Sequence, residues 1–416
     1  MADWTQSMRQ TFEYYIVDPN TWKDMRLIDT VKSCTINRDS EADTLGSASF
    51  DITDSVGECY IRAYLVTIQN GVTEKHPLGT FLVQTPSSSY DGKSRSVSMD
   101  AYTPLLELKE KQPPLGYYVP KSTYYKVVKE GDRYVKTKEK VESVMGAELR
   151  VKNASGETIA VSTTTGEPVF KQTVGTEESY YCVPAESSVI SLACRLTDEN
   201  LRAPVIRTDL STALHYDFIA DTDDTWFSFL KDLISNVNYE FSLDELGRVL
   251  FAPKQKIESL QPVWTYSDDN SSILYSDLTM NHDLYGIPNV VEVVYSTTND
   301  ILYATARNED VNSPTSIPNR GREIVHRVTD PELIGTPTQA QVQDYADRLL
   351  ESLSTVEYTI SYSHGYCPVR LGDCIRLNYA SAGIKNIKAK VISQTIKCDA
   401  GCKVTEKAVF TTKLWR

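Results

Sequence analysis

Short runs of alternating apolar and polar residues, separated by turn residues, constrain the fold of this chain more than any other feature. In the first hundred residues these runs predict strands at Phe12–Val17, Val31–Ile36, Ser47–Ile52, Tyr60–Gln69, His76–Gln84 and Ser96–Thr103. Asn70-Gly71 stands between two of the runs, and this dipeptide is typical of a two-residue hairpin turn. Short strands at this spacing predict a small antiparallel β-barrel or sandwich in residues 1–107.

Residues 108–186 differ from the segment before them. The stretch KQPPLGYYVPK is rich in Pro and Gly and is typical of a linker. Further strands are expected at Tyr124–Val128, Arg133–Thr137, Glu148–Lys152, Thr158–Ser162 and Pro168–Thr173. We interpret 108–186 as a β-hairpin-rich insertion, either a small separate domain or a protruding arm.

Helical signals follow in residues 187–269, which we interpret as an intervening α+β domain. Ser187 or Ser188 is expected to cap a helix through Val189–Leu196. The stretch TWFSFLKDLISNVN predicts a second helix, with Trp226, Phe229, Leu230, Leu233 and Val237 on one face. A hairpin is then expected from Tyr239–Leu243 and Arg248–Pro253.

Residues 270–416 return to strand patterns and predict a second tube-like β-domain with one packed helix. The apolar run Leu284–Tyr295 predicts its first long strand, with Val291 and Val293 facing the core. Val311–Arg322 is expected to be a loop, and Thr338–Leu353 an amphipathic helix capped by Thr336 or Thr338. Further strands are predicted at Val356–Tyr362, Cys374–Tyr379, Lys388–Ile396 and Thr405–Thr411.

The charge of the chain is strongly acidic and unevenly distributed. Its 416 residues carry a net charge of −13, and residues 177–300 hold 21 Asp or Glu against 7 Lys or Arg. An acidic surface repels phosphates, which disfavours general nucleic-acid binding. No apolar run approaches the roughly 18 residues of a membrane span, and the N-terminus lacks a signal-peptide pattern. We therefore expect no stable membrane insertion, folding in a reducing cytoplasm, and cysteines that remain thiols.

Candidate chemistry is sparse. Cys398 and Cys402 are weak candidates for a metal site, together with Cys367 and Cys374, but the spacing of the earlier pair does not suit zinc. The aspartates at 221, 223 and 224 precede a helix and are better explained by capping than by calcium binding. Motifs for nucleotide, hydrolase or zinc-protease chemistry are missing from the sequence. We therefore expect no catalytic residues, no cofactor and no enzymatic activity.

Several segments together resemble the baseplate or tail-tip hub proteins of tailed bacteriophages and phage-like contractile particles. They are SASFDITDS, CYIRAYLVTIQNGVTEKHPLGTFLVQTPS, WFSFLKDLISNVNYEFSLDELGRVLFAP, IPNVVEVVYS, QAQVQDYADRLLESLS and VRLGDCIRLNY. The resemblance covers 1–107 and about 187–416 and leaves the insertion unmatched. It implies a mainly β chain with some α structure and two tail-tube-like β-domains.

The same resemblance implies a structural virion protein at the distal end of the tail, assembled in the host cytoplasm. Three copies would form a ring that joins the sixfold tail tube to a threefold central spike or fibre. The partners implied are other copies in a homotrimer, a tail tube or distal tail protein, the spike or fibre protein and the tape-measure protein. DNA would pass through the channel only as cargo during genome ejection.

Two other functions stay open from the sequence. A receptor- or carbohydrate-binding tail protein would use 108–186 as its binding module. A tail-associated cell-wall hydrolase is disfavoured, because the sequence carries no acid/base pair or zinc signature that such an enzyme needs.

Overall fold

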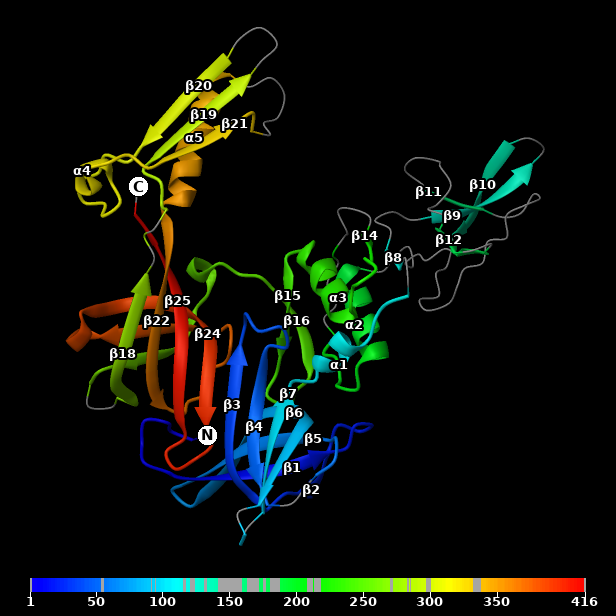
Figure 1. Cartoon of the computed structure of the whole chain (residues 1–416), viewed down its shortest axis with the longest axis vertical. Coiled ribbons are helices and arrows are strands. Elements are labelled where there is room, and N and C mark those ends of the chain that lie inside the picture. Colours follow the sequence, from blue (N-terminus) through cyan, green and yellow to red (C-terminus); the bar gives the residue numbers. More distant parts are fainter. Residues whose placement is uncertain are drawn as a thin grey trace. The chain divides into compact units, whose positions relative to one another are not determined.

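The computed structural model describes most of the chain between residues 2 and 414. The parts left undescribed are 54–55, 91, 94, 115–116, 120–123, 131–132, 141–158, 163–171, 175–176, 180–187, 208–211, 213–217, 270–271, 283, 285, 297–300, 332–337 and both chain ends, 1 and 415–416. The described residues form mainly strands with a few helices, which confirms the predicted fold class (Figure 1).

The chain divides into two compact units. The first unit is built mainly from Met8–Gln255 and includes the short segment Lys397–Ala400. The second consists of Lys256–Ile396 and Gly401–Arg416, together with Asp3–Ser7. The finer division into 1–107, 108–186, 187–269 and 270–416 stays a prediction.

An antiparallel sheet dominates the first unit. Its strands are β1 (Arg9–Val17), β2 (Asp24–Leu27), β3 (Val31–Asp39), β4 (Gly46–Ile52), β5 (Tyr60–Gln69), β6 (Val72–Tyr90) and β7 (Arg95–Tyr102). Their spatial order is β3-β4-β7-β6-β5-β1-β2. The six predicted strands are confirmed, whereas the short strand β2 was not predicted. Asn70 and Gly71 have φ values of +50° and +78° and join β5 to β6, as expected for a tight hairpin.

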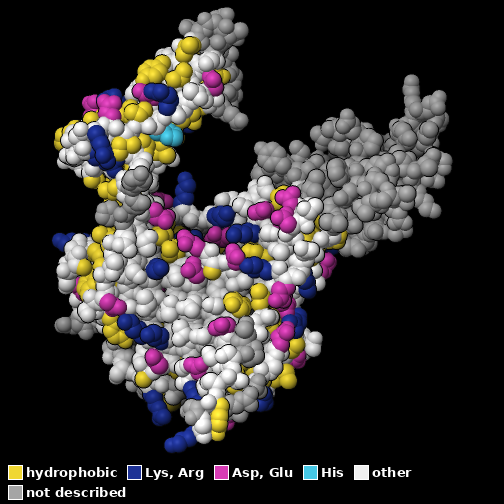
Figure 2. Space-filling view, in the orientation of Figure 1, with side chains coloured by type: hydrophobic (Ala, Val, Ile, Leu, Met, Phe, Trp, Pro, Cys, Tyr) yellow, Lys and Arg dark blue, Asp and Glu magenta, His cyan; other side chains and the backbone are white. Residues whose placement is uncertain are grey.

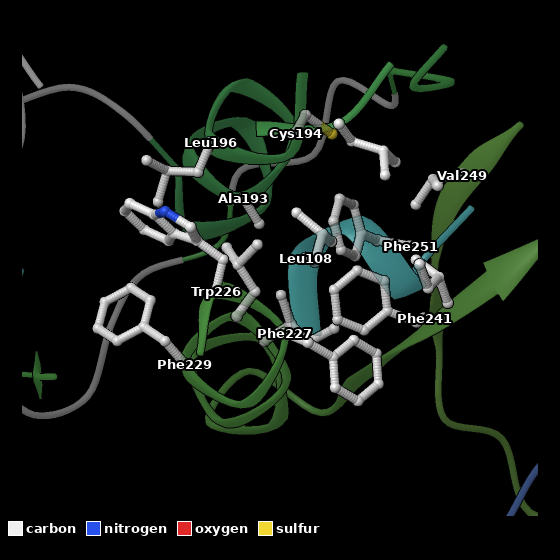
Figure 3. Close-up of a cluster of buried hydrophobic side chains, with 14 of the residues drawn as sticks. Leu108, Ala193, Cys194, Leu196, Trp226, Phe227, Phe229, Phe241, Val249 and Phe251 are labelled. Carbon is white, nitrogen blue, oxygen red and sulfur yellow. The ribbon is translucent and has the colours of Figure 1, made fainter. Parts of the chain in front are cut away.

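Helices of the first unit enclose an aromatic core. They are α1 (Leu106–Glu110), α2 (Val189–Asn200) and α3 (Trp226–Ser235), and the hairpin β15 (Tyr239–Leu243) and β16 (Val249–Pro253) packs with them. Side chains of Ser188 and Thr225 cap α2 and α3, which confirms both predicted starts. Figure 3 shows the rings of Phe227, Phe241 and Phe251 grouped together, with neighbouring centroids 5.3 and 5.1 Å apart. Since Phe227 is buried as well, α3 buries a wider face than the sequence predicted.

The turn of this hairpin contacts the sheet through one backbone carbonyl. The Leu246 oxygen accepts hydrogen bonds from Trp22 Nε1 at 2.8 Å, Thr80 Oγ1 at 2.9 Å and Arg62 Nη2 at 3.2 Å. Gly247 follows with φ +72°, and a Cβ atom there would lie 2.7 Å from Thr80 Cβ. The hairpin and the sheet therefore meet at a distance that only glycine allows at this position.

The segment predicted as an insertion contains several short strands. They are β8 (Tyr118–Val119), β9 (Tyr124–Glu130), β10 (Arg133–Lys140), β11 (Ile159–Ser162), β12 (Gln172–Val174) and β13 (Glu177–Ser179). Strands β9 and β10 pair in an antiparallel arrangement, which confirms the predicted hairpin, and β8 pairs with β14 (Phe218–Ile219). The strand predicted at Glu148–Lys152 lies outside the described residues.

The second unit contains a larger sheet in which β18, β22, β25 and β24 lie in that order (Figure 1). Strand β23 pairs with β24, and β17 pairs with β23 in the parallel direction. The elements are β17 (Pro262–Ser267), β18 (Leu274–His282), β22 (Thr355–Gly365), β23 (Cys374–Tyr379), β24 (Ile384–Lys397), β25 (Lys403–Lys413) and the short 3₁₀ helices η1 (Ile257–Ser259) and η2 (Ala380–Ala382). The four strands predicted after residue 355 are confirmed.

A separate three-stranded sheet in the second unit holds the apolar run singled out in the sequence. It consists of β19 (Val290–Ser296) between β20 (Ile301–Arg307) and β21 (Val325–Thr329), and helix α5 (Gln339–Leu353) packs on it (Figure 1). Val291 and Val293 are buried against α5, as predicted, and Thr338 caps that helix.

Two expectations about this region are wrong. Strand β19 does not join the larger sheet of β22 and β25, because its hydrogen bonds go to β20 and β21. The expected loop Val311–Arg322 contains the short helix α4 (Ile317–Arg320), whose end at Gly321 has φ +63°. Buried polar side chains, including Asn308, hold this segment through local hydrogen bonds that hydrophobic periodicity does not reveal.

Candidate functional site

The second unit contains a cluster of buried polar side chains inside its larger sheet. The hydroxyl of Tyr266 on β17 lies 3.1 Å from His364 Nε2, 3.1 Å from Cys367 Sγ and 3.3 Å from Glu406 Oε2. Nε2 of His364 is also 3.3 Å from that carboxylate oxygen. Tyr362 and Gln394 donate to Glu406 as well, so strands β17, β22, β24 and β25 all contribute to the cluster.

The electrostatics of the cluster favour a charged pair. Burial opposes a charge on His364, but the carboxylate of Glu406 outweighs it and raises the pKa of the imidazole to about 10. Burial also acts to raise the pKa of Glu406, yet the charge of His364 and the surrounding donors hold that pKa below its usual value. His364 and Glu406 therefore form a salt bridge with the whole pair inside the protein.

The cluster holds residue types that serve as acids, bases and nucleophiles in enzymes. The side chains of His364 and Glu406 are both 0% exposed, and Tyr266, Tyr362 and Cys367 are buried too. In this conformation the groups contact one another and the surrounding core. The arrangement therefore links β22 to β25 through contacts between buried side chains.

The cysteines considered as metal ligands lie in different surroundings. Cys398 is in the turn between β24 and β25, within the segment assigned to the first unit, and its N–H donates to the Cys34 carbonyl. Cys402 is buried at the other end of that turn, in the second unit, with φ +40°. Cys367 belongs to the polar cluster, and Cys374 begins β23. Among the residues that the structure describes, no three His, Cys, Asp or Glu side chains are grouped as metal ligands.

The aspartates before α3 serve the helix start. Asp224 accepts a hydrogen bond from the Ser228 hydroxyl at 2.7 Å and another from the Asp221 N–H at 2.8 Å. Thr225 and Ser228 complete a capping box. The N-cap of α3 is therefore Thr225 and not one of the aspartates expected from the sequence, and Asp224 supports the cap through the Ser228 hydroxyl.

Exposed apolar side chains occur on strands at sheet edges. Among the described strands, β2 ends the sheet of the first unit and β18 ends the larger sheet of the second. On β2 the side chains of Met25 and Leu27 are 67% and 47% exposed, and on β18 Tyr275 and Met280 are 42% and 43% exposed. We call β2 and β18 the assembly edges, because exposed strand edges with apolar side chains are templates for pairing with another chain.

The edge of β20 is covered instead. Gln339 Nε2 donates to the Tyr303 carbonyl at 2.7 Å, and Gln343 Nε2 donates to the Thr305 carbonyl at 3.0 Å. Two amides from α5 thus occupy acceptors that an added strand would need. Ile301 and Tyr303 nevertheless leave apolar surface on this sheet, and Figure 2 shows hydrophobic side chains over this part of the molecule.

Neither the polar cluster nor the assembly edges were predicted from the sequence. His364 and Glu406 have no spacing that marks them as partners, since pairing of β22 with β25 brings them together. The alternation in Thr355–Gly365 was the available signal, because it places His364 on the same strand face as Ile360 and Tyr362. Strand β2 is too short for its pattern to stand out.

None of the described helices is long and apolar enough to cross a membrane.

Searches by sequence found no match: no family model fits the chain, and no curated protein is significantly similar to it. Solved structures are similar over nearly the full length. A tail protein from Neisseria meningitidis MC58 is 11% identical, with a TM-score of 0.53 and 98% of each chain covered. The 43 kDa tail protein of prophage MuSo2 from Shewanella oneidensis is 8% identical, with a TM-score of 0.50, covering 95% of this chain and 97% of the other. The chain therefore has the fold of these tail proteins.

Proposed function

We propose that this chain is a structural protein of a phage tail, located in the tail tip or baseplate of the virion. The observation that carries the proposal is the shared fold with the Neisseria tail protein over 98% of both chains. A match of that extent includes both units and not only one common domain. The exposed assembly edges support a role in building a larger particle.

The finer proposal is a hub made of three copies in a closed ring. Each copy carries two assembly edges, β2 in the first unit and β18 in the second. If the β2 edge of one copy pairs with the β18 edge of the next, the contact is heterologous, and such contacts form a closed ring when the rotation between neighbouring copies is one third of a turn. Three copies would present six units, which suits a connection between a sixfold tail tube and a threefold spike or fibre.

The proposed partners follow from this position. The ring would contact the tail tube or a distal tail protein on one side and the central spike or fibre on the other, with the tape-measure protein ending near it. The net charge of −13 suits a channel wall that DNA passes without binding, because like charges repel. Assembly would take place in the host cytoplasm.

The test is the mass of the purified chain in solution, measured by analytical ultracentrifugation with and without extracts that supply the other tail proteins. We expect a trimer, either alone or on addition of the extract. Met25→Lys and Met280→Lys should each weaken it at least tenfold, because each places a charge on an assembly edge. Val311→Lys is the matched control, since Val311 is 69% exposed but lies in the loop between β20 and β21.

Two results would contradict the proposal. A stable dimer that never changes state excludes the threefold ring. Electron microscopy of the parent particle with an antibody against this chain should label one end of the tail tube, and label on the capsid would exclude a tail function altogether.

A further inference from the structure

Two cysteines from distant parts of the sequence meet in the first unit. Cys34 lies on β3, and Cys398 lies in the turn after β24. The backbone N–H of Cys398 donates to the carbonyl of Cys34 at 3.0 Å. This hydrogen bond brings the two residues together, although 363 residues separate them in the sequence.

The side chains of the two cysteines point to the same place. The hydroxyl of Tyr14 on β1 hydrogen-bonds to the thiols of both Cys34 and Cys398. All three side chains are buried, with Cys34 4% and Cys398 8% exposed. The two sulfur atoms are therefore neighbours around a single oxygen, and both cysteines are in the thiol form.

The turn gives one of the thiols a route to solvent. Lys397, Asp399 and Ala400, which flank Cys398, are all exposed. Short exposed turns open locally at lower cost than core strands, so a small reagent can reach Cys398 before it reaches Cys34. The same opening also separates Cys398 from the Tyr14 hydroxyl.

We propose that Cys34 and Cys398 form a redox site, in which a low-molecular-weight disulfide oxidises the two thiols to an intramolecular disulfide. The Cys398 thiolate attacks one sulfur of the reagent, which forms a mixed disulfide and releases one small thiol that takes up a proton. The Cys34 thiolate then attacks Cys398 Sγ, which forms the Cys34–Cys398 bond and releases the second small thiol. The protein loses two electrons, and the reagent gains them.

The site gives the protein a reduced state in a reducing compartment and an oxidised state in an oxidising one. In a reducing cytoplasm the thiols persist and the Tyr14 hydrogen bonds hold the turn. In oxidising surroundings the new bond joins β3 to the β24–β25 turn and closes a very long loop of chain. Long closed loops restrict the unfolded state most, so the oxidised protein should resist unfolding better than the reduced protein.

The experiment treats the full-length protein with oxidised glutathione, blocks the remaining thiols and maps the peptides by mass spectrometry without reduction. We expect a peptide pair that joins Cys34 to Cys398. We also expect the thermal midpoint to rise by about 5 °C and to fall back after addition of dithiothreitol. Cys34→Ser and Cys398→Ser should abolish both effects, whereas Cys374→Ser, at another buried cysteine, should retain them.

The peptide map of the unmodified protein decides the question even if a serine variant fails to fold. A map without the Cys34–Cys398 pair overturns the proposal, as does a map in which Cys398 pairs with Cys402. The same midpoint rise in oxidised Cys34→Ser would also overturn it, because the stabilisation would then come from another bond.

Discussion

Nε2 of His364 lies 3.3 Å from Oε2 of Glu406, and neither side chain is exposed to solvent. The two residues belong to neighbouring strands of one sheet, where His364 pairs with Val404 and Glu406 pairs with Tyr362. Two phenol hydroxyls and an amide complete the coordination of the carboxylate. Each charge of this buried pair is stabilised by the other. If one were removed, the remaining charge would be buried without a partner.

Glu406→Gln should therefore destabilise the second unit by about 3–5 kcal/mol, the usual cost of leaving one buried charge without its partner. The change is nearly isosteric, so packing is largely retained. The loss of unfolding free energy therefore measures the effect of removing the charge. Urea unfolding followed by circular dichroism measures it. Asp344→Asn is the control, because its ion pair with Arg348 is exposed and should contribute little. Equal losses in the two variants would contradict a special role for the buried pair.

The stability of the pair should depend on pH in a defined direction. The folded pKa of His364, about 10, is above its usual 6.5, so its contribution is complete below pH 6.5 and is lost as pH rises toward 10. The pKa of Glu406 is lowered from 4.5, so its contribution is present above pH 4.5 and is lost as pH falls through the lowered value. Unfolding free energies of the wild type and of His364→Gln/Glu406→Gln should converge from pH 7 to 10. A constant difference over that range would show that His364 is not charged in the fold.

Val291→Asp and Val293→Asp should each unfold the three-stranded sheet and release α5. Both valines are completely buried against that helix, and an isolated carboxylate in an apolar core costs several kcal/mol. Limited proteolysis within residues 284–353 should accelerate at least tenfold. Val325→Asp on the neighbouring strand β21 is the control, since Val325 is 45% exposed. If both buried variants resist the protease like the wild type, the core assignment is wrong.

Gly247→Ala should cost more than Gly71→Ala, although both glycines have similar positive φ values of +72° and +78°. Each alanine meets the backbone penalty of about 1 kcal/mol for a left-handed conformation. At Gly247 the added methyl group also meets Thr80 Cβ at 2.7 Å, whereas at Gly71 no atom lies within 4 Å. The excess should be about 1–3 kcal/mol, as for overpacked sites, and thermal unfolding measures it. Equal losses would indicate that the hairpin turn can move away from the sheet.

Local patterns predicted the elements of this fold well. Asn70-Gly71 forms the expected hairpin turn, because its two positive φ values are a property of the dipeptide itself. The helix capped by Thr338 buries Val342, Ala346 and Leu350, since the 3.6-residue period of its apolar side chains fixes which face is covered. These features depend on neighbours within a few residues, which the sequence displays directly.

The sequence did not allow us to predict in the same way which strands and side chains come together. The sequence by itself determined that Val290–Ser296 is a strand with Val291 and Val293 inward, but tertiary structure decided that its partners are β20 and β21. Only tertiary structure also brought His364 to Glu406 and Cys34 to Cys398. The physical reason is that strand periodicity specifies which side chains are buried, whereas pairing depends on the packing of segments far apart in the chain.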